Sequence, residues 1–133
     1  MNIEYKEILN FKPKELQDLF LSVKWKVGEE PEKLVIAMKQ SDTVFSAWDN
    51  KRLVGLINAL DDGIMTAYIH FLLVDPAYQS KGIGKELLRM AAEKYNDYLR
   101  IVLICDDEET EFYQNSGFKP AEGTMPMFIN RQR

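Results

Sequence analysis

Residues 74–85 read VDPAYQSKGIGK, the most informative segment of the sequence. It follows an apolar run over residues 66–74 and leads into an amphipathic helix expected over residues 82–95, with Pro76 ending the strand. The start of a helix presents unpaired backbone N–H groups at the positive end of its dipole, and glycine lets an anion approach them closely. The stretch therefore predicts a phosphate-binding turn. The alternative is that Gly82 and Gly84 only relieve crowding where a strand meets a helix.

Two common phosphate-binding motifs do not match this turn. A P-loop requires glycine at the position of Gln79 and serine or threonine at the position of Glu86. The dinucleotide-binding fingerprint requires glycine at the position of Leu87. The spacing therefore excludes both of these classes of nucleotide-binding protein.

Hydrophobic periodicity places the other elements around this turn. Alternating or continuous apolar residues predict strands, and apolar residues at helical spacing predict helices. Strands are expected over residues 2–9, 43–48, 53–60, 99–105 and 125–130, and helices over residues 13–25, from residue 31 to about residue 38, and over residues 107–115. Helix 82–95 lies between two apolar strands, a β-α-β unit for which parallel pairing and a right-handed crossover are expected. This order predicts an α/β sheet with helices on both faces and strand 66–74 near its centre.

The composition is that of one globular domain. The chain has 133 residues, of which 46% are hydrophobic and 29% charged, so a single domain over residues 1–133 is expected. A net charge of −4 argues against the broad basic surface that nucleic acids require. The single cysteine cannot form an intrachain disulfide, the N-terminus carries no signal segment, and no apolar stretch has the length of a membrane helix. We expect a cytoplasmic protein without nucleic-acid or membrane partners.

Two motifs together resemble those of the GNAT acyltransferase superfamily. The first is Gln79-x-x-Gly82-x-Gly84, which follows the strand end LLVDPAY at residues 72–78, and the second is FYQNSGF at residues 112–118. The resemblance covers about residues 1–130. It implies the GNAT fold, a mixed central sheet with helices on both faces that is splayed between its fourth and fifth strands.

The resemblance implies acetyl-CoA as co-substrate, and no cysteine, histidine or carboxylate spacing in the sequence suggests a metal site. The pyrophosphate would lie on the amides of residues 79–85, and the pantetheine arm would extend along strand 66–74, with the Val74 N–H donating to the thioester carbonyl. The residues expected to contact acetyl-CoA are Leu72, Leu73, Val74, Gln79, Ser80, Lys81, Gly82, Ile83, Gly84, Lys85, Asp106, Phe112 and Tyr113. Lys81 and Lys85 have the alternative of being solvated surface lysines.

Two side chains are candidates for proton transfer. The family carries a tyrosine at the place of Tyr113 that protonates the departing CoA thiolate, and a phenol of pKa about 10 is protonated at neutral pH. The alternative for Tyr113 is a packed aromatic. His70 is the only histidine, and strand alternation places it on the same face as Leu72 and Val74, where it could remove a proton from the attacking amine. Arylalkylamine acetyltransferases carry a histidine at this position, and a hydrogen-bonded core histidine is the alternative.

The chain departs from the family near residue 106. Many relatives have asparagine where Asp106 stands, and an ionised aspartate can accept but not donate a hydrogen bond to the pantetheine arm. The acidic run over residues 106–111 is suited to the start of the last helix. Cys105 is expected to be a buried structural thiol, which favours direct transfer over an acyl-enzyme.

The acceptor is expected to be a small cationic amine. In this fold the first two helices, their connector and the hairpins select the acceptor, and these segments are rich in acidic residues, together with one tryptophan. The residues concerned are Trp25, Glu29, Glu30, Glu32, Asp61 and Asp62. The function predicted is N-acetyl transfer from acetyl-CoA to a primary amine by direct attack. The alternatives are a peptide N-terminal acetyltransferase and a catalytically silent CoA-binding or interaction module; a homodimer is an open alternative to a monomer.

Overall fold

The computed structural model describes residues 2–131, and these form two compact units that divide between Leu103 and Ile104. The strands are β1 (Ile3–Glu7), β2 (Thr43–Asp49), β3 (Arg52–Asp61), β4 (Thr66–Val74) and β5 (Arg100–Leu103). The helices are α1 (Pro13–Ser22), α2 (Pro31–Gln40), α3 (Ile83–Lys94) and α4 (Thr110–Gln114). Three short 3-10 turns complete the order, η1 (Lys26–Glu29), η2 (Pro76–Tyr78) and η3 (Asp107–Glu109). Within the described residues no helix is both long and apolar enough to cross a membrane.

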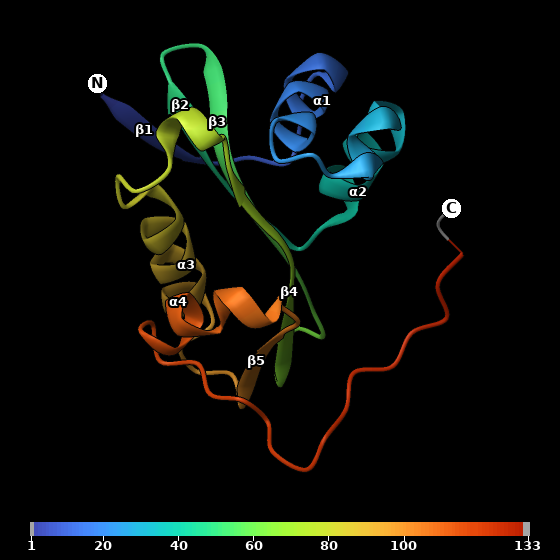
Figure 1. Ribbon diagram of the computed structural model, residues 1–133, viewed down its shortest axis with the longest axis vertical. Helices are drawn as coiled ribbons and strands as arrows, with labels where there is room; N and C mark the ends of the chain where they lie inside the picture. The colour runs from blue at the N-terminus through green and yellow to red at the C-terminus, as the bar shows by residue number, and fades with distance from the viewer. Residues whose placement is uncertain (1, 132–133) are drawn as a thin grey trace. The chain divides into compact units, whose positions relative to one another are not determined.

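The first unit is built on one mixed sheet with the strand order β1-β2-β3-β4-β5. Strands β1 to β4 are antiparallel to one another in sequence order, whereas β5 runs parallel to β4. The parallel pair flanks α3, as the β-α-β prediction requires. Figure 1 shows β1 at one edge of the sheet, a position that its mixture of charged and apolar residues favours.

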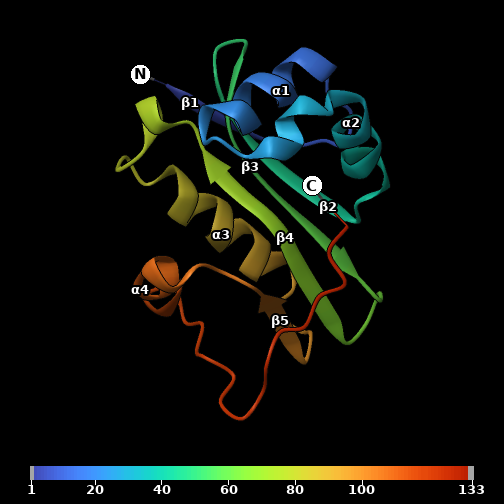
Figure 2. The same ribbon diagram turned by 45° about the vertical axis from the view of Figure 1, so that its right-hand side comes forward.

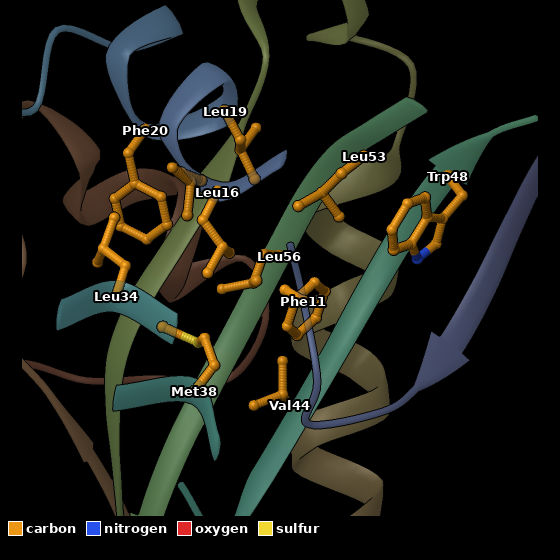
Figure 3. Close-up of a cluster of buried hydrophobic side chains, with 11 residues drawn as sticks. Phe11, Leu16, Leu19, Phe20, Leu34, Met38, Val44, Trp48, Leu53 and Leu56 are labelled. Carbon is orange, nitrogen blue, oxygen red and sulfur yellow. The ribbon is translucent and has the colours of Figure 1, made fainter. Parts of the chain in front are cut away.

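Helices cover both faces of this sheet (Figure 2). On one face, α1 and α2 bury apolar side chains against β2, β3 and β4, and Figure 3 shows this cluster. Its members are Phe11, Leu16, Leu19, Phe20, Leu34, Met38, Val44, Trp48, Leu53, Leu56 and Leu73. The helical spacing of the α1 members explains why one side of that helix is buried.

Helix α3 packs on the opposite face, where a glycine permits close approach. A Cβ on Gly55 of β3 would lie 3.1 Å from Ile83 Cγ2 and 3.3 Å from Leu87 Cδ1, a separation that leaves little room for a side chain. At its other end α3 is anchored by the Tyr95 hydroxyl, which lies 2.6 Å from Thr43 Oγ1 and donates to Asp61 Oδ2 at 2.7 Å. Both ends of the helix are therefore fixed to the sheet.

The sheet is splayed between β4 and β5, which confirms the expectation. Thr66 to Ile69 pair with Arg100 to Leu103, and the register ends there. On that side of β4, no strand of the described residues pairs with the stretch from His70 to Val74. Half of β4 therefore has a free backbone edge.

A β-bulge interrupts β4 where the splay begins. Asn58 lies opposite Phe71 and Ala59 lies opposite Ile69, so His70 is the extra residue in β4. A bulge breaks the two-residue alternation of side chains along a strand. Ile69 and Phe71, which simple alternation places on one face, consequently lie on opposite faces of the sheet.

Several predicted elements differ from the structure. The closing strand expected over residues 125–130 is wrong, because residues 118–131 form neither helix nor strand. Pro126 lacks the N–H that a strand ladder uses, and no strand of the described residues pairs with this segment. The apolar strand predicted over residues 99–105 is shorter in the structure, and β5 is half-exposed because it pairs on one side only. Helix 13–25 ends at Ser22, and Lys24 then adopts a left-handed φ of 64°.

Candidate active site

The loop between β4 and α3 is closed by its own side chains. Asp75 Oδ1 accepts a hydrogen bond from the Ala77 N–H at 2.9 Å, which caps the η2 turn. Gln79 Nε2 donates to the Val74 carbonyl at 2.9 Å and so connects the far side of the loop to the strand end. These two bonds give the loop a defined shape before α3 begins.

The turn between β2 and β3 holds this loop from the side. Arg52 Nη2 lies 2.8 Å from Asp75 Oδ2, and the Tyr78 hydroxyl donates to Asp49 Oδ2 at 2.6 Å. The hydrogen bond to the Asp49 carboxylate raises the pKa of Tyr78, so its phenol stays protonated at neutral pH. These two contacts could not be predicted, since nothing in the sequence links residues 49–52 to residues 75–78.

The start of α3 presents amide donors beside open space. Ser80 and Gly82 have φ values of 62° and 84°, and Gly82 is the N-cap residue of the helix, with no side chain to bond the first turn. The first intrahelical bond runs from the Glu86 N–H to the Gly82 carbonyl at 3.0 Å, so the N–H groups of residues 83–85 have no partner within the helix. A Cβ on Gly82 would meet no atom within 4 Å.

This arrangement fits a phosphate group. Open space at Gly82 gives an anion access to amides at the positive end of a twelve-residue helix. Lys81 and Lys85 are both exposed at the same place and add positive charge. The residues from Gln79 to Lys85 therefore suit the pyrophosphate of a CoA molecule.

Along the unpaired edge of β4, over residues 70–74, some backbone groups point into the gap between β4 and β5. The Asp75 N–H donates to the Val54 carbonyl of β3 at 2.8 Å. In an antiparallel ladder alternate residues bond to the same neighbour, so the backbone groups of Leu72 and Val74 point away from β3. Leu73, by contrast, is buried in the cluster under α1 and α2. The N–H and C=O groups of Leu72 and the N–H of Val74 can thus pair with an extended ligand, whereas the Val74 carbonyl already accepts a hydrogen bond from Gln79.

The predicted face of His70 is wrong, and the bulge is the reason. Val74 pairs with Gly55 on the α3 face, and Leu72 lies on that same face. The His70 ring instead stacks on Phe71, with centroids 3.9 Å apart, and Phe71 packs against the cluster under α1 and α2. His70 therefore lies with Phe71 rather than with Leu72 and Val74.

His70 belongs to a row of aromatic rings. Tyr68 lies 5.9 Å from it on one side, and beyond Phe71 the row continues to Trp25, whose ring centroid is 5.9 Å from that of Phe71. Packing against these rings removes water from the imidazole and lowers the pKa of His70 below its ordinary value. The ring is therefore neutral at pH 7 and can accept a proton.

The acidic residues expected near the acceptor have different surroundings. The Asp62 carboxylate accepts hydrogen bonds from the N–H groups of residues 64, 65 and 66, which lowers its pKa. Asp61 accepts from Tyr95, and Glu30 pairs with Lys33 at 2.8 Å. These three carboxylates stabilise local structure, whereas Glu29 at the end of η1 and Glu32 in the first turn of α2 are exposed.

The second unit contains the remaining candidates. The Tyr113 side chain is buried in an edge-to-face arrangement with Phe112 and Phe118, and burial raises the pKa of its phenol. Asp106 precedes the η3 turn and makes no side-chain cap, although its carbonyl accepts from the Glu109 N–H at 2.9 Å. Partial burial also raises the pKa of Cys105, which disfavours the thiolate that a nucleophile needs.

The described residues contain no group of three or more histidine, cysteine, aspartate or glutamate side chains that could hold a metal ion.

Comparison with known proteins identifies the family. The family model described as "Acetyltransferase (GNAT) domain" matches residues 21–125. A curated relative, "Uncharacterized N-acetyltransferase ycf52" of Pyropia yezoensis, is 30% identical over 95% of this chain and 79% of its own length. The chain belongs to the GNAT acetyltransferase family.

Other relatives share part of their length with this chain. "Histone acetyltransferase TAP1" of Glycine max is 39% identical over 60% of this chain, a region that makes up 36% of the soybean protein. The chain thus spans about a third of such relatives. Among solved structures, "Acetyltransferase, GNAT family protein SP0256" from Streptococcus pneumoniae TIGR4 has a TM-score of 0.84 and 27% identity over 98% of this chain and 100% of its own. A putative acetyltransferase from Deinococcus radiodurans R1 has a TM-score of 0.84 and 30% identity over 97% of this chain and 88% of its own.

Proposed function

We propose that this chain transfers an acetyl group from acetyl-CoA to the primary amine of a small cationic molecule by direct attack. One observation carries the proposal: the amides of residues 83–85 and the free edge of β4 meet at the same strand end. A ligand with a pyrophosphate at one end and an amide-containing arm at the other suits this combination. Acetyl-CoA has that form, and acetyl-CoA dependence is general for the family.

Binding divides between two elements. Residues 79–85 hold the pyrophosphate through their backbone N–H groups, and Lys81 and Lys85 add attraction that salt will weaken. The backbone of Leu72 and Val74 pairs with the pantetheine arm as a neighbouring strand would. The Val74 N–H then stabilises negative charge as it develops on the thioester carbonyl oxygen.

Proton transfer uses two further side chains. His70 is neutral at pH 7 and takes the proton that the attacking amine must lose, directly or through water. The amine nitrogen forms a bond to the carbonyl carbon, the bond from that carbon to sulfur breaks, and the thiolate takes a proton. Tyr113 is the proposed donor, since its raised pKa keeps the phenol protonated.

The aromatic row supports a cationic acceptor more directly than the acidic residues do. Tyr68 and Phe71 stack on His70, and Trp25 lies beyond Phe71. An ammonium over an aromatic face is attracted by about 0.5–2 kcal/mol. Glu29 and Glu32 remain exposed and add long-range attraction. We therefore retain a small cationic amine as the proposed acceptor.

A lysine side chain is the second candidate acceptor. The relative from Glycine max is named a histone acetyltransferase, and the lysine ε-amine is also a primary cationic amine. Peptide N-termini form a third class, and a protein that binds CoA without transferring acetyl is the non-enzymatic alternative. These acceptors differ in size and can be compared in one assay.

The test is thiol release from acetyl-CoA over a panel of amines, with mass spectrometry of the products. The panel contains polyamines, arylalkylamines, aminoglycosides, lysine-containing peptides and peptides with free N-termini. We expect amine-dependent thiol release and an acetylated small amine. An acetylated peptide would replace the proposed acceptor, and binding of acetyl-CoA without any amine-dependent release would overturn the proposed catalysis.

A further inference from the structure

A buried asparagine contacts the bulge in β4. Asn58 lies in β3 with 1% of its surface exposed, opposite Phe71. Its Oδ1 accepts a hydrogen bond from the Phe71 N–H at 2.9 Å, and its Nδ2 donates to Ser41 Oγ at 3.0 Å. Ser41 Oγ donates in turn to the Ala37 carbonyl of α2 at 2.8 Å. One side chain therefore links the backbone beside His70 to a helix on the same face.

The orientation of this carboxamide follows from its partners. The Phe71 N–H can only donate, so the atom that faces it must be the oxygen. The Ser41 hydroxyl uses its proton on the Ala37 carbonyl, so it offers a lone pair to the nitrogen of Asn58. A flipped carboxamide would place two donors together at Phe71. Only one orientation of the Asn58 carboxamide therefore pairs every donor with an acceptor.

Core packing alone does not explain an asparagine at this position. The neighbouring residue on the same face of β3, Leu56, is part of the apolar cluster under α1 and α2. Burying an amide costs free energy unless its hydrogen bonds are made. An apolar residue would avoid that cost, but it would leave the Phe71 N–H without its acceptor. This N–H belongs to the residue that directly follows the bulged residue His70, and it bonds to the Asn58 side chain.

We propose that Asn58 is a positioning residue for acetyl transfer: by holding the Phe71 N–H it fixes the bulge, and the bulge directs His70 toward the acceptor rather than the α3 face. The catalytic part of this inference rests on the proposed function. Ser41 acts through Asn58, because it holds the nitrogen of the carboxamide and thereby sets which atom faces Phe71.

Two measurements test the role of Asn58. His70 is the single histidine of the chain, so NMR can follow its imidazole without overlap from another histidine. In Asn58→Ala the imidazole should lose its fixed packing, and its pKa should rise toward the ordinary value of about 6.5. Turnover with the best amine of the panel should fall about 10²-fold, the usual effect of a misplaced catalytic group, while the acetyl-CoA Kd stays unchanged.

Two more variants separate positioning from general stability. Ile57→Ala removes a buried side chain from the next residue of β3, on the α3 face, so it should lower Tm without moving the His70 pKa. Ser41→Ala keeps Asn58 but frees its nitrogen, so it should shift the His70 pKa in the same direction by less. If Asn58→Ala does not fold, the His70 pKa and the turnover of Ser41→Ala decide whether the Asn58 side chain positions His70.

The proposal is overturned if the Asn58 and Ser41 variants that fold keep both the wild-type pKa of His70 and the wild-type turnover. It is equally overturned if Ile57→Ala moves that pKa as far as they do. A wild-type protein that acetylates no amine contradicts the proposed function instead. In that case the His70 titration alone decides whether Asn58 fixes the bulge.

Discussion

Replacing the glycine at the start of α3 should separate substrate binding from stability. Gly82 has a φ of 84°, and a Cβ there would meet no atom within 4 Å, so Gly82→Val introduces strain without a clash. A left-handed backbone costs an ordinary residue about 1–2 kcal/mol. The free energy of unfolding should fall by about that amount, and the variant should remain folded.

The substitution should weaken the free energy of acetyl-CoA binding by more than it lowers the free energy of unfolding. The new side chain would stand in the open space in front of the N–H groups of residues 83–85. A hydrogen bond to a charged group contributes about 1.5–3 kcal/mol, so each bond lost raises Kd by about ten- to a hundredfold. Isothermal titration with acetyl-CoA measures this loss, and thermal unfolding measures the stability of the same sample.

The turn between β3 and β4 offers a matched control. Gly63 has a φ of 87°, and a Cβ there would likewise meet no atom within 4 Å, so Gly63→Val carries the same strain. It precedes β4, whose length of about 26 Å at about 3.3 Å per residue separates it from the loop. Gly63→Val should lower Tm and leave Kd alone. If Gly82→Val also binds acetyl-CoA with the wild-type Kd, residues 79–85 do not hold the phosphates.

Three further predictions concern single side chains. Tyr113→Phe should keep acetyl-CoA affinity but lower the single-turnover rate about 10²–10⁴-fold, and a wild-type rate would make Tyr113 a packing residue. Tyr95→Phe should lower the free energy of unfolding by about 1–3 kcal/mol in denaturant titrations, because the buried Thr43 hydroxyl loses a partner; an unchanged midpoint would contradict this. His70 has a lowered folded pKa, so the unfolded chain binds more protons and stability should fall as pH drops below about 6.5. His70→Gln should remove that part of the pH dependence, and an identical pH profile in the variant would show that another group causes it.

The strand, loop and helix over residues 66–95 could be predicted from sequence because their signals are local. Pro76 ends the strand, Gly82 starts the helix, and the apolar stripe of α3 repeats at helical spacing. The parallel pairing of β4 and β5 follows from the helix between them. A short run of residues is enough to specify each of these features.

The orientation of His70 could not be predicted in this way. Alternation along a strand assumes that every residue has a partner, and the bulge adds one residue to β4 without any mark in the sequence of β4 itself. The sign lies in the neighbouring strand, where Asn58 interrupts the otherwise apolar run from Leu53 to Leu60. A buried asparagine between apolar residues indicates a backbone group that needs a partner.

The strand predicted over residues 125–130 was wrong for a different reason. Met127, Phe128 and Ile129 have the composition of a strand, but strand formation needs a neighbouring strand to pair with. Local composition carries no information about such a neighbour. The contacts of Arg52 with Asp75 and of Tyr78 with Asp49 were missed for the same reason, because they join segments that are distant in sequence.

The most direct test of the site is an NMR titration of the isotope-labelled protein with acetyl-CoA, followed at each backbone amide. We predict that the amides of Ile83, Gly84 and Lys85 shift together with those of Leu72 and Val74, with a common Kd. CoA lacking the acetyl group should reproduce the shifts of residues 83–85 and reduce the shift of Val74. Saturating acetyl-CoA that leaves these amides unmoved, or that shifts residues elsewhere instead, would contradict the assignment of this strand end as the acetyl-CoA site.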